Sequence, residues 1–181
     1  MKAAAARLIA SASFVAVLSG CASSGIGMTP SVPENLKVPA TETLSVVAQA
    51  DGVQIYECDA SKTDPKLFEW AFKAPEAELF NNAGKKIGKH YAGPTWESDD
   101  GSKVVGEVKA RDDGPDTTAI PWLLLRAKSV EGNGTFAKTQ SIQRVKTVSG
   151  KAPADGCSQA QRGNVARVAY RATYNFYVSR P

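Results

Sequence analysis

The only histidine of the chain lies in a stretch whose residue types could carry acid–base or binding chemistry, KHYAGPTWESDDGSK at residues 89–103. If this stretch forms strands around its Gly-Pro bend, strand alternation places His90 on one face near Trp96. The same alternation turns Tyr91 and Glu97 to the opposite face. A histidine beside an aromatic ring can carry a proton or form a hydrogen bond to a ligand. We therefore expect a candidate ligand-binding site here, with a half-buried histidine bonded to backbone as the structural alternative.

The sequence assigns no catalytic residue. It contains neither a Gly-x-Ser-x-Gly elbow nor a His-Glu-x-x-His motif, and no nucleophile or second base is evident beside His90. Asp99–Asp100 and Asp112–Asp113 each precede a glycine, which favours turns over a calcium loop, because calcium needs more oxygen ligands at regular spacing. We expect no metal site and no cofactor. A small envelope hydrolase that uses His90 and Glu97 is the enzymatic alternative.

The N-terminus predicts a lipid-anchored protein of the cell envelope. A basic start is followed by the apolar run Leu8–Leu18, which is typical of a secretory signal peptide and too short for a membrane span. The segment 18–21, Leu-Ser-Gly-Cys, resembles the bacterial lipobox, in which the cysteine is lipidated and becomes the first mature residue. Residues 1–20 are then the signal peptide and Cys21 is the lipidation site. Because Ala22 follows rather than aspartate, we expect the outer membrane, facing the periplasm.

The two remaining cysteines, Cys58 and Cys157, are predicted to form a disulfide, because two thiols in an oxidising envelope most simply pair. Free buried thiols are the alternative. The formal charge of +4 falls by two when the signal peptide, which carries Lys2 and Arg7, is removed. Lysine and arginine are scattered along the chain, so we expect no nucleic-acid partner.

The mature chain reads as one domain behind a tether. Residues 21–43 are rich in Ser, Gly and Pro and predict a flexible tether whose last part lies against the domain. Residues 44–181 predict a single all-β domain, an antiparallel sandwich or barrel of about eight strands with little helix. Glycine-containing turns punctuate it at Asp51–Gly52, Asn82–Gly84, Asp99–Gly101 and Glu131–Gly134.

Alternating apolar residues identify individual strands. In the closing segment, residues 165–178, one face carries Val168, Tyr170, Ala172, Tyr174, Phe176 and Val178. Residues 68–73 predict a half-buried strand with the rings of Phe68, Trp70 and Phe72 on its inner face, where core packing is expected. Residues 120–130 are almost continuously apolar, which suits a central strand covered on both faces. Residues 139–148 have apolar positions three apart and permit a short helix, but their Thr, Val and Ile content favours a strand.

Four blocks in this order resemble the family of domain of unknown function 3455: GVQIYEC, GKHYAGPTWESDDGSKVVGEV, IPWLLLRA, and GC followed by RVAYRATYNFY. The resemblance covers residues 33–178. It implies a secreted or envelope protein and carries over no particular activity. A nicotinamide enzyme is not supported, because no Gly-x-Gly-x-x-Gly follows a strand.

These patterns together predict a non-enzymatic, membrane-anchored domain that binds a ligand or a protein. The membrane is its partner through the lipid, and the ligand is a small molecule, a glycan or a protein. The envelope hydrolase and a purely structural scaffold are the rival hypotheses. A concave site lined by His90, Trp96 and Glu97 would favour binding or catalysis, whereas a filled interior would favour the scaffold.

Overall fold

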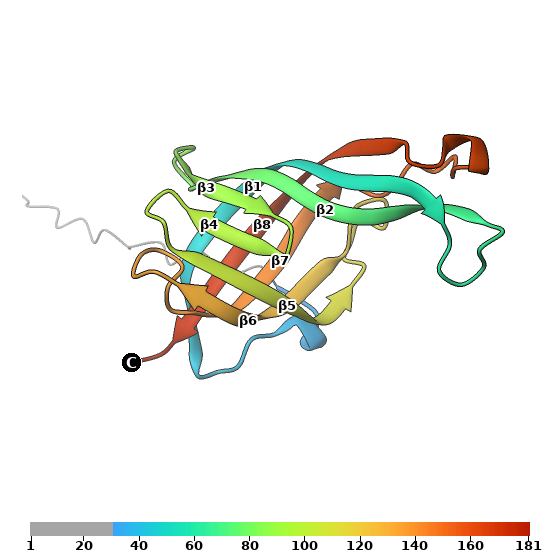
Figure 1. Ribbon diagram of the computed structural model, residues 1–181. Helices are drawn as coiled ribbons and strands as arrows, with labels where there is room; N and C mark the ends of the chain where they lie inside the picture. Colours follow the sequence, from blue (N-terminus) through green and yellow to red (C-terminus); the bar gives the residue numbers. More distant parts are fainter. Residues whose placement is uncertain (1–30) are drawn as a thin grey trace, which may run out of the picture.

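A computed structural model describes residues 31–181, which form one closed barrel of eight antiparallel strands in which each strand pairs with the next (Figure 1). The strands are β1 (Glu42–Ala60), β2 (Phe68–Phe80), β3 (Lys86–Tyr91), β4 (Thr95–Ser98), β5 (Lys103–Asp112), β6 (Trp122–Glu131), β7 (Thr139–Ser149) and β8 (Val165–Ser179). Two short 3₁₀ helices are η1 (Glu34–Leu36) and η2 (Gln159–Gln161). The predicted all-β class is confirmed, and β8 closes the sheet by pairing with β1. Closure removes the exposed edges that a sandwich would leave.

Strand alternation accounts for the barrel core. On β8, Tyr170, Ala172, Tyr174 and Phe176 are buried in one cluster inside the barrel, as their period of two predicts. Residues 139–148 are a strand, not a helix. Their spacing of three does not mark one face: Ile142 lies in the barrel core, Val145 packs in a separate buried cluster with Leu36, and Val148 is exposed beyond a register shift with Lys146 at a positive φ of 50°.

The hairpin predicted at Asp51–Gly52 is wrong, because β1 runs through these residues without interruption. Gly52 pairs with Ala77 of β2 and with Tyr170 of β8. A Cβ atom on Gly52 would come within 2.1 Å of the carbonyl oxygen of Glu76. The glycine therefore serves the close approach of β2 rather than a turn.

The other three predicted turns are present, and two of them close one end of the barrel. The Asp100 carboxylate accepts hydrogen bonds from Ser102 and from the backbone and hydroxyl groups of Thr135, which ties the β4–β5 turn to the β6–β7 loop. These hydrogen bonds hold the pKa of Asp100 far below its usual range. The same loop places Phe136, fully buried, against Phe176 with ring centroids 4.4 Å apart. This end of the barrel is filled by side chains.

A small second cluster lies outside the barrel wall. Leu36 of η1 packs with Trp122 of β6 and Val145 of β7, and its carbonyl accepts a 2.7 Å hydrogen bond from Gln143. The first half of β6 is therefore covered on both faces, as predicted for residues 120–130, whereas its second half is exposed. The blue segment before β1 in Figure 1 makes this cover.

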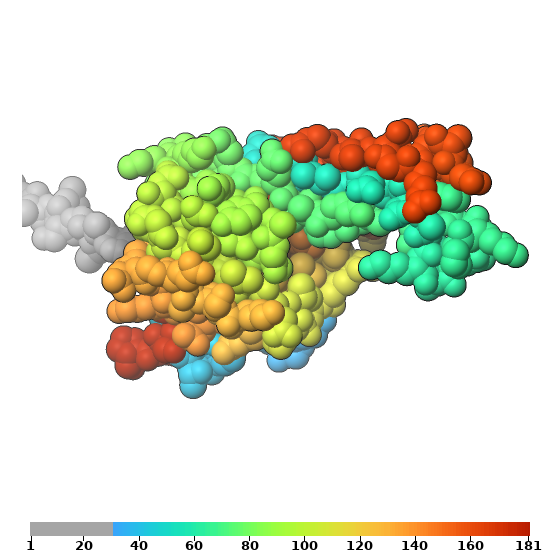
Figure 2. Space-filling model, in the orientation of Figure 1, coloured from blue at the N-terminus to red at the C-terminus, as the bar shows by residue number. Residues whose placement is uncertain are grey.

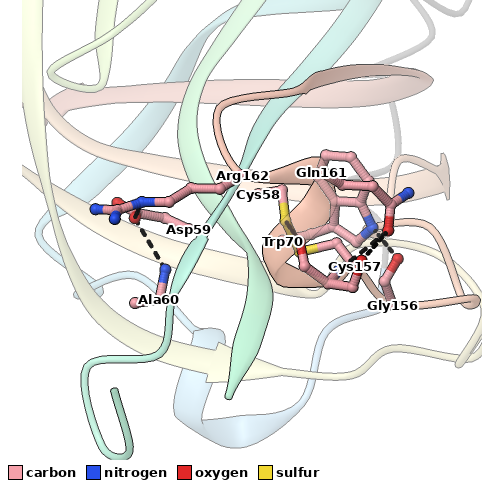
Figure 3. Close-up of a disulfide and its surroundings, with 9 residues drawn as sticks. Cys58, Asp59, Ala60, Trp70, Gly156, Cys157, Gln161 and Arg162 are labelled. Atoms are coloured by element: carbon pink, nitrogen blue, oxygen red, sulfur yellow. Dashed lines mark hydrogen bonds and ion pairs between the residues drawn. A yellow bond between two sulfur atoms is a disulfide. The ribbon is translucent and has the colours of Figure 1, made fainter. Parts of the chain in front are cut away.

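Strands β1, β2 and β8 continue beyond the barrel as an arm, which is clear in Figure 1. The predicted disulfide between Cys58 and Cys157 is present here, with Cα atoms 6.0 Å apart. Figure 3 shows Trp70 beside it, where the indole Nε1–H donates a 2.7 Å hydrogen bond to the Gly156 carbonyl. The expectation that Phe68, Trp70 and Phe72 pack in the core is wrong: none of them belongs to a buried cluster, and Phe72 is 53 % exposed on this arm.

Candidate functional site

An open cavity of about 590 Å³ enters the barrel at the end opposite Phe136. Its rim is formed by β2 near Pro75, by the β3–β4 turn at residues 92–94 and by residues 120–121 before β6. Figure 2 shows the surface hollowed between β2 and the yellow segment that follows β5. We call this space the barrel cavity. Its volume lies in the range of about 300–1,000 Å³ that is usual for small-molecule sites.

His90 forms part of the cavity wall and is 2 % exposed. Its Nδ1 lies 2.8 Å from the carbonyl oxygen of Thr95, so the N–H of the ring is assigned to Nδ1. Burial lowers the pKa of His90 to about 3. The positive charge of Arg144 lowers it further, whereas the hydrogen bond to Thr95 acts in the opposite direction. The ring is therefore neutral at physiological pH, and its Nε2 is a hydrogen-bond acceptor.

Trp96 stacks on His90, as their cross-strand pairing requires. The two residues are register partners on β3 and β4, with ring centroids 4.4 Å apart and an interplanar angle of 12°. Tyr174 of β8 meets both rings edge-on, at 5.0 Å from His90 and 5.2 Å from Trp96. Gly106 of β5 makes room for the indole, because a Cβ there would lie 2.9 Å from it.

Tyr91 and Glu97 lie on the outer face of the same strands, as alternation predicts, and neither lines the barrel cavity. The Tyr91 hydroxyl donates a 2.6 Å hydrogen bond to Glu97, whose carboxylate also pairs with Lys89 at 3.4 Å. The hydrogen bond from Tyr91 holds the pKa of Glu97 below its usual value. Of the four residues predicted to bind a ligand, the structure thus brings His90 and Trp96 to the cavity and leaves the other two outside it.

Arg144 is the main cavity residue that the sequence reasoning missed. It lines the cavity from β7, and its Nε donates a 3.0 Å hydrogen bond to the Pro121 carbonyl. It is the register partner of Tyr174, so the two side chains lie next to each other on the inner face. A signal was available: Arg144 stands two residues after Ile142, whose side chain is in the core, so a strand places this charge inside the barrel.

Three buried polar groups in the cavity wall have no hydrogen-bond partner among residues 31–181: Nε2 of Gln54, Nε1 of Trp96 and the hydroxyl of Tyr174. Arg144 and Tyr170 lie close enough to affect the pKa of Tyr174, but neither has hydrogen-bonding geometry to its hydroxyl. Burial raises the pKa of Tyr174, so it is a neutral donor. Unpaired buried polar groups are costly, and a ligand with acceptor atoms would relieve that cost.

All charged side chains in the cavity lining are positive. The lining contains Lys73, Arg111 and Arg144, and neither aspartate nor glutamate. Lys73 pairs with Glu57 and Arg111 with Asp113, both outside the cavity and both at 3.4 Å. Arg144 is in none of the ion pairs formed within the described part of the chain. The deepest cation thus has no countercharge.

The remaining chemistry of the described chain is sparse. Residues 31–181 contain no group of three His, Cys, Asp or Glu side chains placed to hold a metal ion. A larger groove, about 1100 Å³, follows the outside of β1. Its buried side chains Tyr177 and Gln143 bond each other at 2.7 Å, and buried Glu42 pairs with Arg126 through one oxygen and leaves the other without a partner. The groove thus offers one unpaired buried polar atom against three in the barrel cavity, which is the stronger candidate. In residues 31–181, no helix is long and apolar enough to cross a membrane.

The fold and the cavity define the class of the protein: an eight-stranded up-and-down barrel that is filled at one end and open at the other. A family model described as "Protein of unknown function (DUF3455)" matches residues 39–178. The chain therefore belongs to this family. Comparison with curated proteins and with solved structures found no match.

Proposed function

We propose that this protein is a lipid-anchored envelope protein whose barrel binds a small molecule in the barrel cavity. The observation that carries the proposal is the combination of apolar walls with buried, unpaired donors in one open space. Leu123, Leu125 and Val108 supply apolar surface, while Trp96 and Tyr174 supply donors. Small-molecule sites are usually lined by apolar side chains with a small number of polar groups among them.

Binding is favoured over the hydrolase alternative by the positions of its two residues. His90 points into the barrel, whereas Glu97 lies on the outer face and is bonded to Tyr91. The two side chains are separated by the barrel wall and cannot act on one bond. A His90 ring with a pKa of about 3 is also far from the value near the operating pH that a general acid or base needs.

The scaffold alternative is less well supported than binding. A scaffold is expected to satisfy its buried polar groups, because an unpaired buried donor costs about 1–3 kcal/mol. The indole nitrogen of Trp96 and the hydroxyl of Tyr174 remain unpaired in the described chain beside an open space.

Anchoring rests on the sequence, since Cys21 lies outside the described residues. The proposal places the barrel at the outer membrane, facing the periplasm, on a lipid at Cys21 followed by a short segment. Replacing Cys21 with Ala should release the protein from membranes or leave it unprocessed, as measured by membrane fractionation and mass. A variant that is processed and membrane-bound like the wild type would exclude lipidation of this residue.

Cavity binding is tested with a neutral fluorescent apolar probe, N-phenyl-1-naphthylamine, on the full chain carrying Cys21→Ala. Val108 lines the cavity mouth and is 49 % exposed, so Val108→Trp should block entry without disturbing the fold. Val130 is 43 % exposed on β6 away from the cavity, and Val130→Trp is the matched control. We expect the probe to bind wild type and control and to lose roughly tenfold or more in affinity on Val108→Trp, a loss equal to about 1.4 kcal/mol. Equal binding by all three proteins, or by none, would refute the cavity as the site.

A further inference from the structure

We infer that the ligand of the barrel cavity is an apolar molecule with a single carboxylate group, held by Arg144 and Tyr174. This inference rests on the proposed function and adds the chemical class of the ligand. Its starting point is the register of β7 and β8, which places Arg144 directly opposite Tyr174 on the inner face. Directly paired residues have Cβ atoms about 4.5–5.5 Å apart, so one small anion can reach both side chains.

The donor set matches an anion rather than a cation or a neutral donor. Arg144 keeps its guanidinium directed by one bond, from Nε to Pro121, which leaves the terminal nitrogens for a ligand. Tyr174, 1 % exposed, has a hydroxyl without a partner among residues 31–181. A guanidinium fork and a hydroxyl beside it are donors that a carboxylate accepts, and the fork binds its two oxygens in parallel.

The number of free cations sets the charge of the ligand. Lys73 and Arg111 at the rim have carboxylate partners, Glu57 and Asp113, so only Arg144 is uncompensated. One unpaired positive charge, on the half-buried Arg144, neutralises one negative charge, which favours a monoanion over a doubly charged phosphate ester. The absence of acidic residues from the cavity lining means that nothing in the wall repels the anion.

The rest of the cavity selects an apolar body. On the other side of Arg144, its register partner on β6 is Leu123, which lines the cavity together with Leu125 and Ile120. Trp96 adds an aromatic face. A molecule with its carboxylate at Arg144 would therefore place its carbon skeleton against these side chains, where burial contributes about 25 cal/mol per Å² of apolar surface.

The test compares dodecanoate with dodecanol as competitors of N-phenyl-1-naphthylamine at pH 7.5, on the full chain carrying Cys21→Ala. The two competitors share the alkyl chain and differ in the charge of the head. We expect dodecanoate to bind wild type roughly 10- to 100-fold more tightly than dodecanol, the effect of one charge-assisted pair. Arg144→Gln should abolish that preference, and Arg144→Lys should keep part of it. Arg171→Gln, on the exposed outer face of β8, is the matched control and should leave it unchanged.

The outcomes separate the two proposals. If the neutral probe binds and Val108→Trp blocks it, but dodecanoate and dodecanol compete equally in wild type, the cavity site stands and the carboxylate inference is overturned. If dodecanoate is preferred and Arg144→Gln retains the full preference, Arg144 is not the anion site and the inference is likewise overturned. If the neutral probe does not bind at all, the proposed function itself fails. The wild-type comparison needs no variant, so it holds even if Arg144→Gln folds poorly.

Discussion

Acidification from pH 7 to pH 5 should destabilise this protein through one side chain, His90. It is the only histidine in the chain, it is 2 % exposed, and it has no carboxylate partner. The folded-state pKa of about 3 lies well below the ordinary value of 6.5. In the unfolded chain His90 binds a proton near pH 6.5, whereas in the native barrel it stays neutral down to about pH 3.

The sign and size of the effect follow from proton linkage. Because the folded pKa is lowered, the unfolded state binds more protons than the native state between pH 6.5 and 3, and the free energy of unfolding falls as pH falls. The slope approaches 1.4 kcal/mol per pH unit, so the loss between pH 7 and pH 5 is about 2 kcal/mol. Above pH 7 the histidine contribution is fully present and constant.

Urea denaturation of the wild type at pH 7, 6 and 5 measures this loss, and His90→Phe is the reference. Phenylalanine can keep the stacking on Trp96 but cannot titrate, and it leaves the Thr95 carbonyl without its partner. The variant should therefore be less stable at pH 7 and nearly independent of pH between 7 and 5. Asp100 and Glu97 remain ionised in this window, because hydrogen bonds lower the pKa values of both carboxyl groups.

The refuting result is a wild type whose free energy of unfolding changes by less than about 0.5 kcal/mol between pH 7 and pH 5, which corresponds to a folded pKa close to 6.5. The same conclusion would follow if His90→Phe lost as much stability on acidification as the wild type. Either outcome means that water or a counterion reaches the imidazole ring of His90. The ring is then less shielded from solvent than its position beside Thr95 in the structure implies.

Two further predictions concern stability. The Cys58–Cys157 bridge joins residues 99 positions apart, so its reduction should lower the free energy of unfolding by up to about 4.7 kcal/mol. In calorimetry the melting temperature should fall by roughly 5–20 °C, and an unchanged melting temperature would contradict this prediction. In Gly106→Ala the new Cβ would lie 2.9 Å from the Trp96 indole and 3.2 Å from Leu125. The free energy of unfolding in urea should therefore fall by about 1–3 kcal/mol, and the near-ultraviolet circular dichroism of Trp96 should change. Unchanged stability would show that the indole ring moves aside freely.

Short-range patterns were enough to predict most strands and three of the four turns. Alternation along residues 165–178 identified the inner face of β8, and turns such as Asn82–Gly84 follow from local backbone preference. The same local evidence misread Asp51–Gly52. A glycine that admits a turn also admits close approach of a neighbouring strand, and only the position of Glu76 distinguishes the two.

Alternation also determined half of the site. His90 and Trp96 share a face because they are register partners on β3 and β4. A short turn joins these strands, so the pairing is local in the sequence. Closure of the barrel decided what lies around them. Tyr174 reaches the two rings only because β8, remote in the sequence, completes the cylinder beside β1. The count of strands was predictable, but a sandwich and a barrel share the same local pattern and differ only in which strands pair.

The sequence by itself determined the all-β class, the cysteines available for pairing and the side of the strand on which His90 lies, because each depends on composition or on a period of two. Tertiary structure alone decided that Arg144 faces Tyr174 across the β7–β8 pair and has no countercharge in the described chain. The register of two strands is set by the packing of the whole core and by the shift after Val145, and neither can be read from the spacing of residues along one strand.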